Sequence, residues 1–166
     1  MQELAGFDIR YTTEEDVKYL REWIAHPDVL CWFSMADQQE IESALQCWIG
    51  YSRYKCSLTA TIDQEPCGIA TLFLMPYKKV AHHCLFKVVV DPKWQRKGIG
   101  FSLIKNIKHL AKTYFRLETI HIEVFEGNAL ISLLKEKLGF YEVVRQDRYV
   151  KMGDTYLARV LLETEL

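Results

Sequence analysis

The stretch from Val88 to Gly100 carries the clearest chemical signal in the sequence. Apolar residues run into Asp91-Pro92, and a basic, glycine-containing loop, Gln95 to Gly100, then leads into an amphipathic segment. The first N–H groups of a helix have no partner inside the helix and carry the positive end of its dipole. The two glycines of the loop let the backbone approach a ligand closely, and its arginine and lysine add positive charge. This pattern predicts an anion site suited to a diphosphate.

Two other phosphate-binding loops do not fit the same residues. A dinucleotide-binding fingerprint needs a third glycine where Leu103 stands, and a Walker loop needs its lysine after the glycine, whereas Lys97 precedes Gly98. Short glycine motifs are weak signals, so this motif alone also fits an ordinary strand–turn–helix whose glycine serves only packing.

Hydrophobic periodicity predicts the elements that would position this loop. They follow one another in the order β-α-α-β-β-β-α-β-α-β-β. Asp37 is suited to cap the second helix and Gly139 to end the last one. Antiparallel hairpins precede a β-α-β-α core, so the sheet is expected to be mixed. The expected strands are 7–11, 58–62, 68–75, 84–90, 120–124, 143–151 and 155–162, and the expected helices begin near residues 14, 37, 99 and 128.

A second block follows the long helix, and it consists of Ile122-Glu123-Val124, then Asn128, then Gly139-Phe140. Together with Gln95 to Gly100, which matches a Q/R-x-x-G-x-G/A motif, this block resembles the GNAT superfamily of N-acetyltransferases, and the order of elements fits over nearly the whole chain. The final hairpin resembles those of ribosomal-protein N-terminal and spermidine acetyltransferases. The resemblance implies an α/β (α+β) fold in a single domain, residues 1–166, with a mixed central sheet of about seven strands flanked by about four helices. It also implies transfer of an acetyl group from acetyl-coenzyme A to a primary amine.

The resemblance further assigns the residues that would hold acetyl-coenzyme A as co-substrate. Backbone groups of Val88 and Val90 would bind the pantetheine arm, and N–H groups from Gln95 to Gly100 would bind the pyrophosphate. Asn128 would contact the cofactor arm, although its position equally suits a helix N-cap. No metal is expected. The implied cofactor-binding residues are Val88, Val89, Val90, Gln95, Arg96, Lys97, Gly98, Ile99, Gly100 and Asn128.

Acyl transfer needs an amine without its proton, so a proton acceptor beside the amine is useful. The resemblance makes Glu123 the candidate catalytic base and Glu126 a weaker one, and a satisfied sheet carboxylate is the plain alternative for Glu123. Many relatives place a tyrosine that protonates the departing thiolate seven residues after this asparagine, where the chain has Lys135. Tyr141 and Tyr149, on neighbouring strands, are the candidates to replace it.

The acceptor is expected to be an amine on a small molecule, or the N-terminus or a lysine of a protein. Early helices usually line its pocket in this family, which makes Tyr11, Trp32 and Phe33 candidates for that wall, with core packing as the alternative. A non-catalytic acyl-coenzyme A-binding module is the rival function, because Lys135 replaces the expected tyrosine.

Composition argues against several other classes of protein. The net charge of -1, from 21 basic and 22 acidic residues, lacks the basic excess of a dedicated nucleic-acid binder. Five cysteines, an odd number without a C-x-x-C pair, argue against a disulfide framework and a zinc site. Residues 1–16 lack the pattern of a secretory leader, and no run reaches the roughly 18 apolar residues of a membrane helix. The protein is therefore expected in the cytoplasm, without nucleic-acid or membrane partners.

Overall fold

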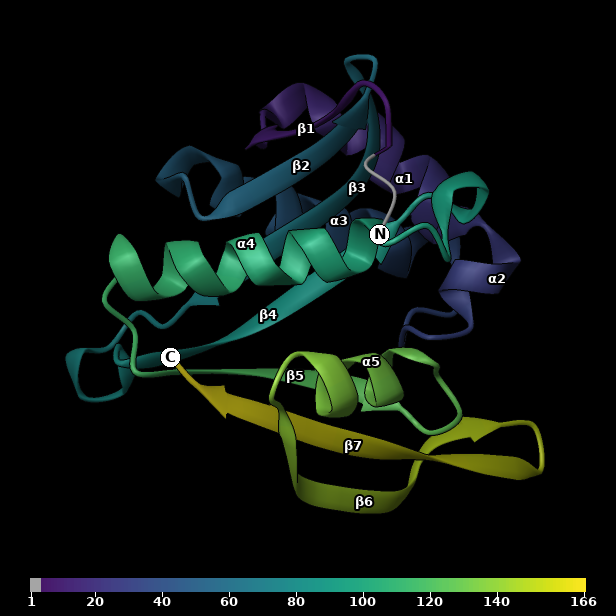
Figure 1. Ribbon diagram of the computed structural model, residues 1–166. Coiled ribbons are helices and arrows are strands. Elements are labelled where there is room, and N and C mark those ends of the chain that lie inside the picture. The colour runs from purple at the N-terminus through teal and green to yellow at the C-terminus, as the bar shows by residue number, and fades with distance from the viewer. Residues whose placement is uncertain (1–3) are drawn as a thin grey trace.

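The computed structural model describes residues 4–166 around one seven-stranded sheet (Figure 1). The strand order is β1-β2-β3-β4-β5-β7-β6, and β4 and β5 are parallel while the other neighbours are antiparallel. The predicted mixed sheet of seven strands is thereby confirmed. Residues 1–3 lie outside the described residues. They begin both the segment that the sequence predicts to lack a secretory leader and the predicted single domain. The strands are β1 Phe7–Tyr11, β2 Ser57–Ile62, β3 Glu65–Leu74, β4 His83–Val90, β5 Thr119–Phe125, β6 Tyr141–Met152 and β7 Thr155–Glu165.

Five α-helices lie within residues 4–166, one more than the sequence predicted. The additional helix, α2, begins at Pro27, directly after His26 ends the preceding helix in an extended conformation. Proline suits the first position of a helix because the N–H it lacks would have had no partner there. Asp37 caps α3 as predicted, because its Oδ1 accepts a hydrogen bond from the Glu40 N–H at 2.9 Å. The helices are α1 Val17–Ala25, α2 Pro27–Leu30, α3 Gln38–Gly50, α4 Ile99–Thr113 and α5 Leu130–Lys137.

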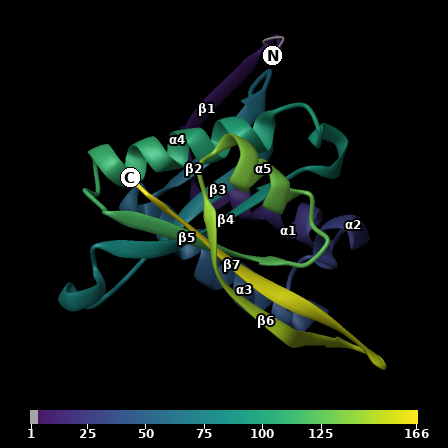
Figure 2. The same cartoon turned by 60° about the horizontal axis from the view of Figure 1, so that its bottom comes forward.

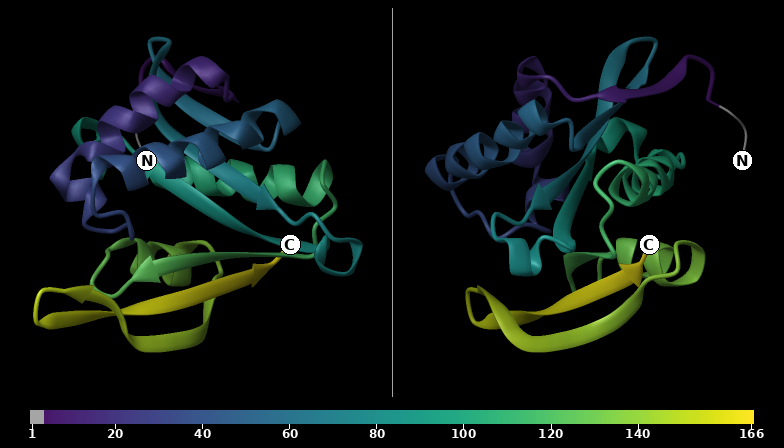
Figure 3. Two further views of the ribbon diagram at one scale, coloured as in Figure 1. Left: turned by 180° about the vertical axis from the view of Figure 1, so that it is seen from behind. Right: turned by 90° about the vertical axis from the view of Figure 1, so that its left-hand side faces the viewer.

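The helices bury both faces of the sheet. Figure 3 shows α1 and α3 on one side of the sheet and α4 on the other. On the α4 side, Leu103 and Ile107 pack with Phe86 in a core that excludes water. Gly68 of β3 lets α4 come close, since a Cβ atom there would lie 2.9 Å from Leu103 Cδ1. On the other side, α1 and α3 bury Trp48 against the sheet.

The sheet opens in its middle, between β4 and β5. These two strands pair only over His83–Leu85 and 119–121, after which β4 follows β3 and β5 follows β7. Figure 1 shows the two strands close together near the C-terminal end of the chain and apart at their far ends. Backbone groups along the diverging stretch of β4 therefore have no strand beside them on that edge.

The last two strands form a long hairpin that projects beyond the rest of the sheet (Figure 2). Gly153 supports its turn with a positive φ of 62°, a conformation that glycine adopts readily. Within residues 4–166, none of the helices combines the length and the apolar character needed to cross a bilayer.

Candidate active site

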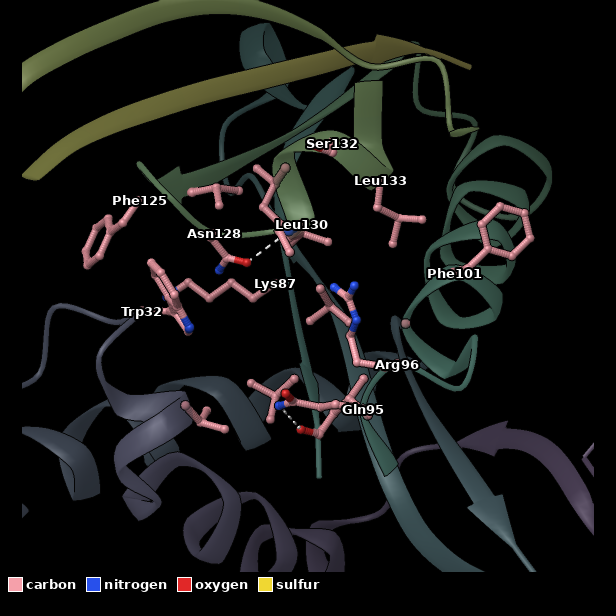
Figure 4. A pocket seen from close by; sticks show the side chains of 18 of the residues that line it. Trp32, Lys87, Gln95, Arg96, Phe101, Phe125, Asn128, Leu130, Ser132 and Leu133 are labelled. Atoms are coloured by element: carbon pink, nitrogen blue, oxygen red, sulfur yellow. Dashed lines mark hydrogen bonds between the residues drawn. The ribbon is translucent and has the colours of Figure 1, made fainter. Parts of the chain in front are cut away.

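A cavity of about 1270 Å³ lies where β4 and β5 diverge. Its walls include residues 32–35 after α2, residues 87–90 of β4, residues 94–98 before α4 and residues 122–125 of β5. Figure 4 shows that side chains from all four segments, and from the start of α5, point into this space. Segments far apart in sequence thus meet in one site at the opening of the sheet.

The turn before α4 presents a row of free backbone N–H groups. Asp91 anchors the turn, because its side chain accepts from the Lys93 N–H at 2.9 Å and its carbonyl accepts from the Trp94 N–H at 2.8 Å. Arg96 and Gly98 then adopt positive φ angles of 65° and 87°. In the described chain, the N–H groups from Gln95 to Gly100 donate to no other residue. Successive N–H groups in such a turn form an anion-binding concavity, so the residues fit the predicted diphosphate.

Three side chains of this turn have distinct positions. The Gln95 Nε2 donates to the Val90 carbonyl at 3.1 Å, which ties the turn to the end of β4. The Lys97 ammonium lies 4.5 Å from the centroid of the Trp94 ring. Arg96 points into the cavity in Figure 4. The turn therefore adds cationic side chains to its free N–H groups.

The open edge of β4 carries the backbone of Val88 and Val90. The Asp91 N–H donates to Cys67 of β3 at 2.9 Å, and residues two apart in a strand direct their backbone groups to the same edge. Val89 therefore faces β3, and Val88 and Val90 face the opening. Because Gln95 already occupies the Val90 carbonyl, the carbonyl and N–H of Val88 are the freer groups. Val89 and Ile99 are buried, at 4% and 1% exposure.

Asn128 lies directly before Ala129, the N-cap residue of α5, and its side chain makes a hydrogen bond to the first turn of the helix. Its Oδ1 accepts from the Leu130 N–H at 2.9 Å. The residue also lines the cavity, and its amide lies over the opening in Figure 4. The side-chain NH₂ group has no partner among residues 4–166 and is available to a ligand.

Glu123 lies on β5 and lines the cavity from the face opposite α4. Its side chain is 40% exposed, and its Oε1 accepts from Arg159 Nη1 of β7 at 2.5 Å. Arg159 also donates to Gln146 Oε1 at 2.8 Å and lies over the ring of Tyr149. The ion pair fixes the carboxylate at the mouth of the opening. Glu126, the weaker candidate, lies outside the cavity lining and pairs with an arginine of β6.

Lys87 is a cavity residue that the sequence-based prediction missed. Its ammonium lies 5.0 Å from the ring centroid of Phe73 and 5.7 Å from that of Trp48. Burial lowers the pKa of this lysine, against smaller opposing effects that include the charge of Glu123. A lysine inside the otherwise apolar run from Leu85 to Val90 is the sequence signal that could have indicated it.

The remaining predicted site residues separate into those that line the cavity and those that do not. Trp32 and Phe33 line it, whereas Tyr11 lies elsewhere and is 44% exposed. Lys135 is exposed and is not part of the lining. No tyrosine within residues 4–166 lines the cavity, and Tyr141 instead donates to Glu163 at 3.1 Å. In the same range no group of three metal-ligating side chains converges.

Comparison with known proteins gives relatives that are similar to this chain in sequence. The chain is 23% identical to an L-amino acid N-acetyltransferase of Escherichia coli K12 over 145 residues, which covers 80% of this chain and 81% of that protein. It is 37% identical to a ribosomal protein bS18 alanine N-acetyltransferase of E. coli K12 over 71 residues, 42% of this chain and 47% of that enzyme.

Solved structures show the same fold over nearly the full length. An acetyltransferase of Salmonella typhimurium, solved with its cofactor acetyl-CoA, superposes with a TM-score of 0.81 at 17% identity and covers 97% of this chain and 94% of its own. A ribosomal-protein-alanine N-acetyltransferase of Brucella melitensis has a TM-score of 0.77 at 20% identity, with 96% and 99% covered. The family model for the acetyltransferase (GNAT) family matches residues 11–140, from the end of β1 to the residue before β6. The chain therefore belongs to the acetyltransferase (GNAT) family.

Proposed function

We propose that this protein transfers an acetyl group from acetyl-CoA to a primary amine in the cavity between β4 and β5. The observation that carries the proposal is the position of the free N–H groups of Gln95 to Gly100 beside the open edge of β4, within one cavity. An anion site next to unpaired strand groups suits a ligand with a diphosphate at one end and an amide-containing arm.

Different residues of this chain would bind different parts of the cofactor. The turn N–H groups and the Arg96 side chain would hold the diphosphate, and the Val88 backbone and the Asn128 amide would hold the arm. When bound, acetyl-CoA supplies a thioester carbon that the amine attacks and a thiolate that leaves. An N–H group on the open edge of β4 is suited to stabilise the developing negative charge on oxygen.

Glu123 is the proposed proton acceptor. A lysine-like amine has a pKa of about 10.4, so it is protonated near neutral pH and must lose that proton before it attacks. Glu123 lines the same cavity as Trp32 and the turn that would hold the diphosphate. An amine bound in this cavity would therefore have a carboxylate in the wall of its site.

The acceptor amine is proposed only as a class of molecules, and the location of the protein only as a cellular compartment. The relatives named above act on L-amino acids or on an alanine of a ribosomal protein, so a small amine and a protein N-terminus are both candidate acceptors, as is a lysine. We place the protein in the cytoplasm because its five cysteines are free, as expected in a reducing compartment. We take the chain to be one acetyltransferase domain.

A screen for thiol release tests the proposal. Acetyl-CoA would be incubated with the protein and polyamines, amino acids, aminoglycosides or N-terminal peptides, and the free thiol and the acetylated amine would be measured together. Thiol release that depends on one of these amines is expected. Cofactor binding without release on any amine would favour the non-catalytic module, which the absence of a tyrosine from the lining within residues 4–166 keeps as the second candidate.

A further inference from the structure

Two residues of opposite charge lie on the two strands that border the opening of the sheet. Lys87 lies on β4 and Glu123 on β5, on neighbouring diverging strands, and both line the cavity. Both side chains point to the face opposite α4, because each alternates along its strand with residues of the α4-side core, Phe86 and Ile122. The two groups do not form an ion pair with each other, since no carboxylate oxygen of residues 4–166 lies within 4.0 Å of the Lys87 ammonium.

Lys87 is a half-buried cation whose ammonium forms no ion pair within residues 4–166. Its aliphatic stem and ammonium lie near the rings of Phe73 and Trp48, which favour a cation only weakly compared with a carboxylate. In residues 4–166, no fully buried side-chain nitrogen or oxygen is left without a hydrogen-bond partner. The Lys87 ammonium has no hydrogen-bond partner among these residues. It is therefore not fully buried and is accessible from the cavity that it lines. A ligand anion in this space would therefore gain a charge-assisted hydrogen bond.

Glu123 has one oxygen occupied and one available. Arg159 donates to Oε1, whereas Oε2 accepts no hydrogen bond from the described residues. The carboxylate thus stays in place through Arg159 and can still receive an ammonium group from the cavity. Together, Lys87 and Glu123 offer a cationic and an anionic contact to one small ligand.

We propose that this pair receives a free α-amino acid as the acceptor, with the carboxylate of the ligand on Lys87 and its ammonium group at Glu123. The inference rests on the proposed acetyl transfer and specifies its substrate class. A zwitterion complements both charges at once. A polyamine would place a second cation near Lys87 and Arg159, and the N-terminus of a peptide has an uncharged amide where the carboxylate of an amino acid would be.

The test compares amino acids with their carboxamides, which keep the amine and remove the negative charge. Thiol release is measured for both series with the wild-type protein, Lys87→Met, Lys87→Arg and the control Lys105→Met, whose lysine is exposed on α4. The wild-type protein should prefer the acid over the amide at least tenfold in kcat/KM. Lys87→Met should lose that preference through a higher KM for the acid, Lys87→Arg should keep part of it, and Lys105→Met should keep all of it.

Several results would overturn the inference, and they are distinguishable from failure of the proposed function. Equal use of acid and amide by the wild-type protein, or better use of a peptide or polyamine, would remove the amino acid as acceptor and leave acetyl transfer standing. An equal loss for acid and amide in Lys87→Met, with acetyl-CoA affinity retained, would assign Lys87 another role. Absence of thiol release with every amine would reject both proposals. The comparison in the wild-type protein needs no variant, so it holds even if Lys87→Met fails to fold.

Discussion

At the scale of single residues, Glu123 combines a cavity position with a structural ion pair to Arg159. Glu123→Gln keeps the shape of the side chain and removes its ability to accept a proton. If the carboxylate accepts the proton of the amine, turnover should fall by roughly 10² to 10⁴ while acetyl-CoA affinity is retained. Steady-state kinetics and calorimetry measure the two quantities.

Glu126→Gln is the matched control, because Glu126 also pairs with an arginine but lies outside the cavity lining. It should leave turnover nearly unchanged. A loss of turnover below about threefold in Glu123→Gln would show that Glu123 has a purely structural role. Similar losses of turnover in both variants would show that the broken ion pairs cause the effect.

Gly100 gives a second residue-scale prediction. A Cβ atom at this position would meet Val90 Cγ2 at 3.7 Å, an ordinary contact, so a side chain fits the fold but enters the cavity. Gly100→Glu should therefore weaken acetyl-CoA binding at least tenfold, about 1.4 kcal/mol, by its bulk and negative charge beside the diphosphate. Calorimetry would measure the affinity.

Gly50→Glu introduces the same change at a helical glycine with open space around it. It lies outside the cavity lining, so acetyl-CoA affinity should be unchanged. Equal affinity of Gly100→Glu and the wild-type protein would place the diphosphate away from the start of α4.

The sequence predicts the residues of the anion turn better than those of the acceptor side. A glycine-containing turn between a strand and a helix is a local pattern, and the free N–H groups follow from it. Lys87, in contrast, lines the cavity only because β4 and β5 diverge, and Arg159 contacts Glu123 only because β7 lies beside β5. Their roles depend on the register of strands distant in sequence, which no local pattern specifies.

At the scale of elements, α5 presents Lys135 to solvent rather than to the cavity. Lys135→Ala should change turnover by less than about twofold and the free energy of unfolding by about 0.5 kcal/mol or less, as for other exposed sites. A tenfold loss of turnover with unchanged cofactor affinity would show that the lysine reaches the departing sulfur. Increased turnover in Lys135→Tyr would show that the position serves an acid.

The start of α1 depends on a buried carboxylate, Asp16. Burial would raise the pKa of Asp16, but hydrogen bonds from Arg10, Thr13 and Thr59 outweigh it and lower this pKa. A lowered folded-state pKa contributes stability that is present above the unfolded value of about 3.9 and is lost as the pH falls through the folded value. Asp16→Asn should therefore cost about 2 kcal/mol of unfolding free energy at pH 7.

Urea unfolding at several pH values tests this expectation. The difference between the wild-type protein and Asp16→Asn should shrink as the pH falls below about 4. The control Glu42→Gln removes a surface ion pair with Arg21 and should cost clearly less. A difference between the wild-type protein and Asp16→Asn that stays constant with pH would contradict the assigned role of the charge.

Most elements could be predicted because their periodicity is local and strong. The residue before a proline avoids the helical conformation, and His26 has a ψ of 131°. The sequence did not indicate α2, since four residues are too few to show helical periodicity. The hairpin strands β6 and β7 are longer than predicted. A register shift between Glu142 and Val144 interrupts the alternation at the start of β6, and the polar end of β7, residues 163–165, is a strand because it pairs with β5.

At the scale of the whole molecule, the sheet works as two halves joined along three residue pairs. One half, β1 to β4 with α1 to α4, supplies the anion turn and Lys87. The other half, β5 to β7 with α5, supplies Glu123 and Asn128. One hydrophobic core continues through both halves, from Leu103 of α4 to Leu134 of α5. The cavity lies where the strands β4 and β5 separate.

If the cavity between β4 and β5 binds acetyl-CoA, calorimetric titration of the protein with acetyl-CoA should detect it, with thermal melting followed in parallel. A ligand that binds only the folded protein at one hundred times its Kd adds about 2.7 kcal/mol, which for this chain length corresponds to a rise of roughly 5 to 10 °C in Tm. We expect one-site binding with such a rise, weakened in Gly100→Glu. If millimolar acetyl-CoA gives no heat of binding and no change in Tm, with folded protein confirmed by circular dichroism, the cavity is not an acetyl-CoA site.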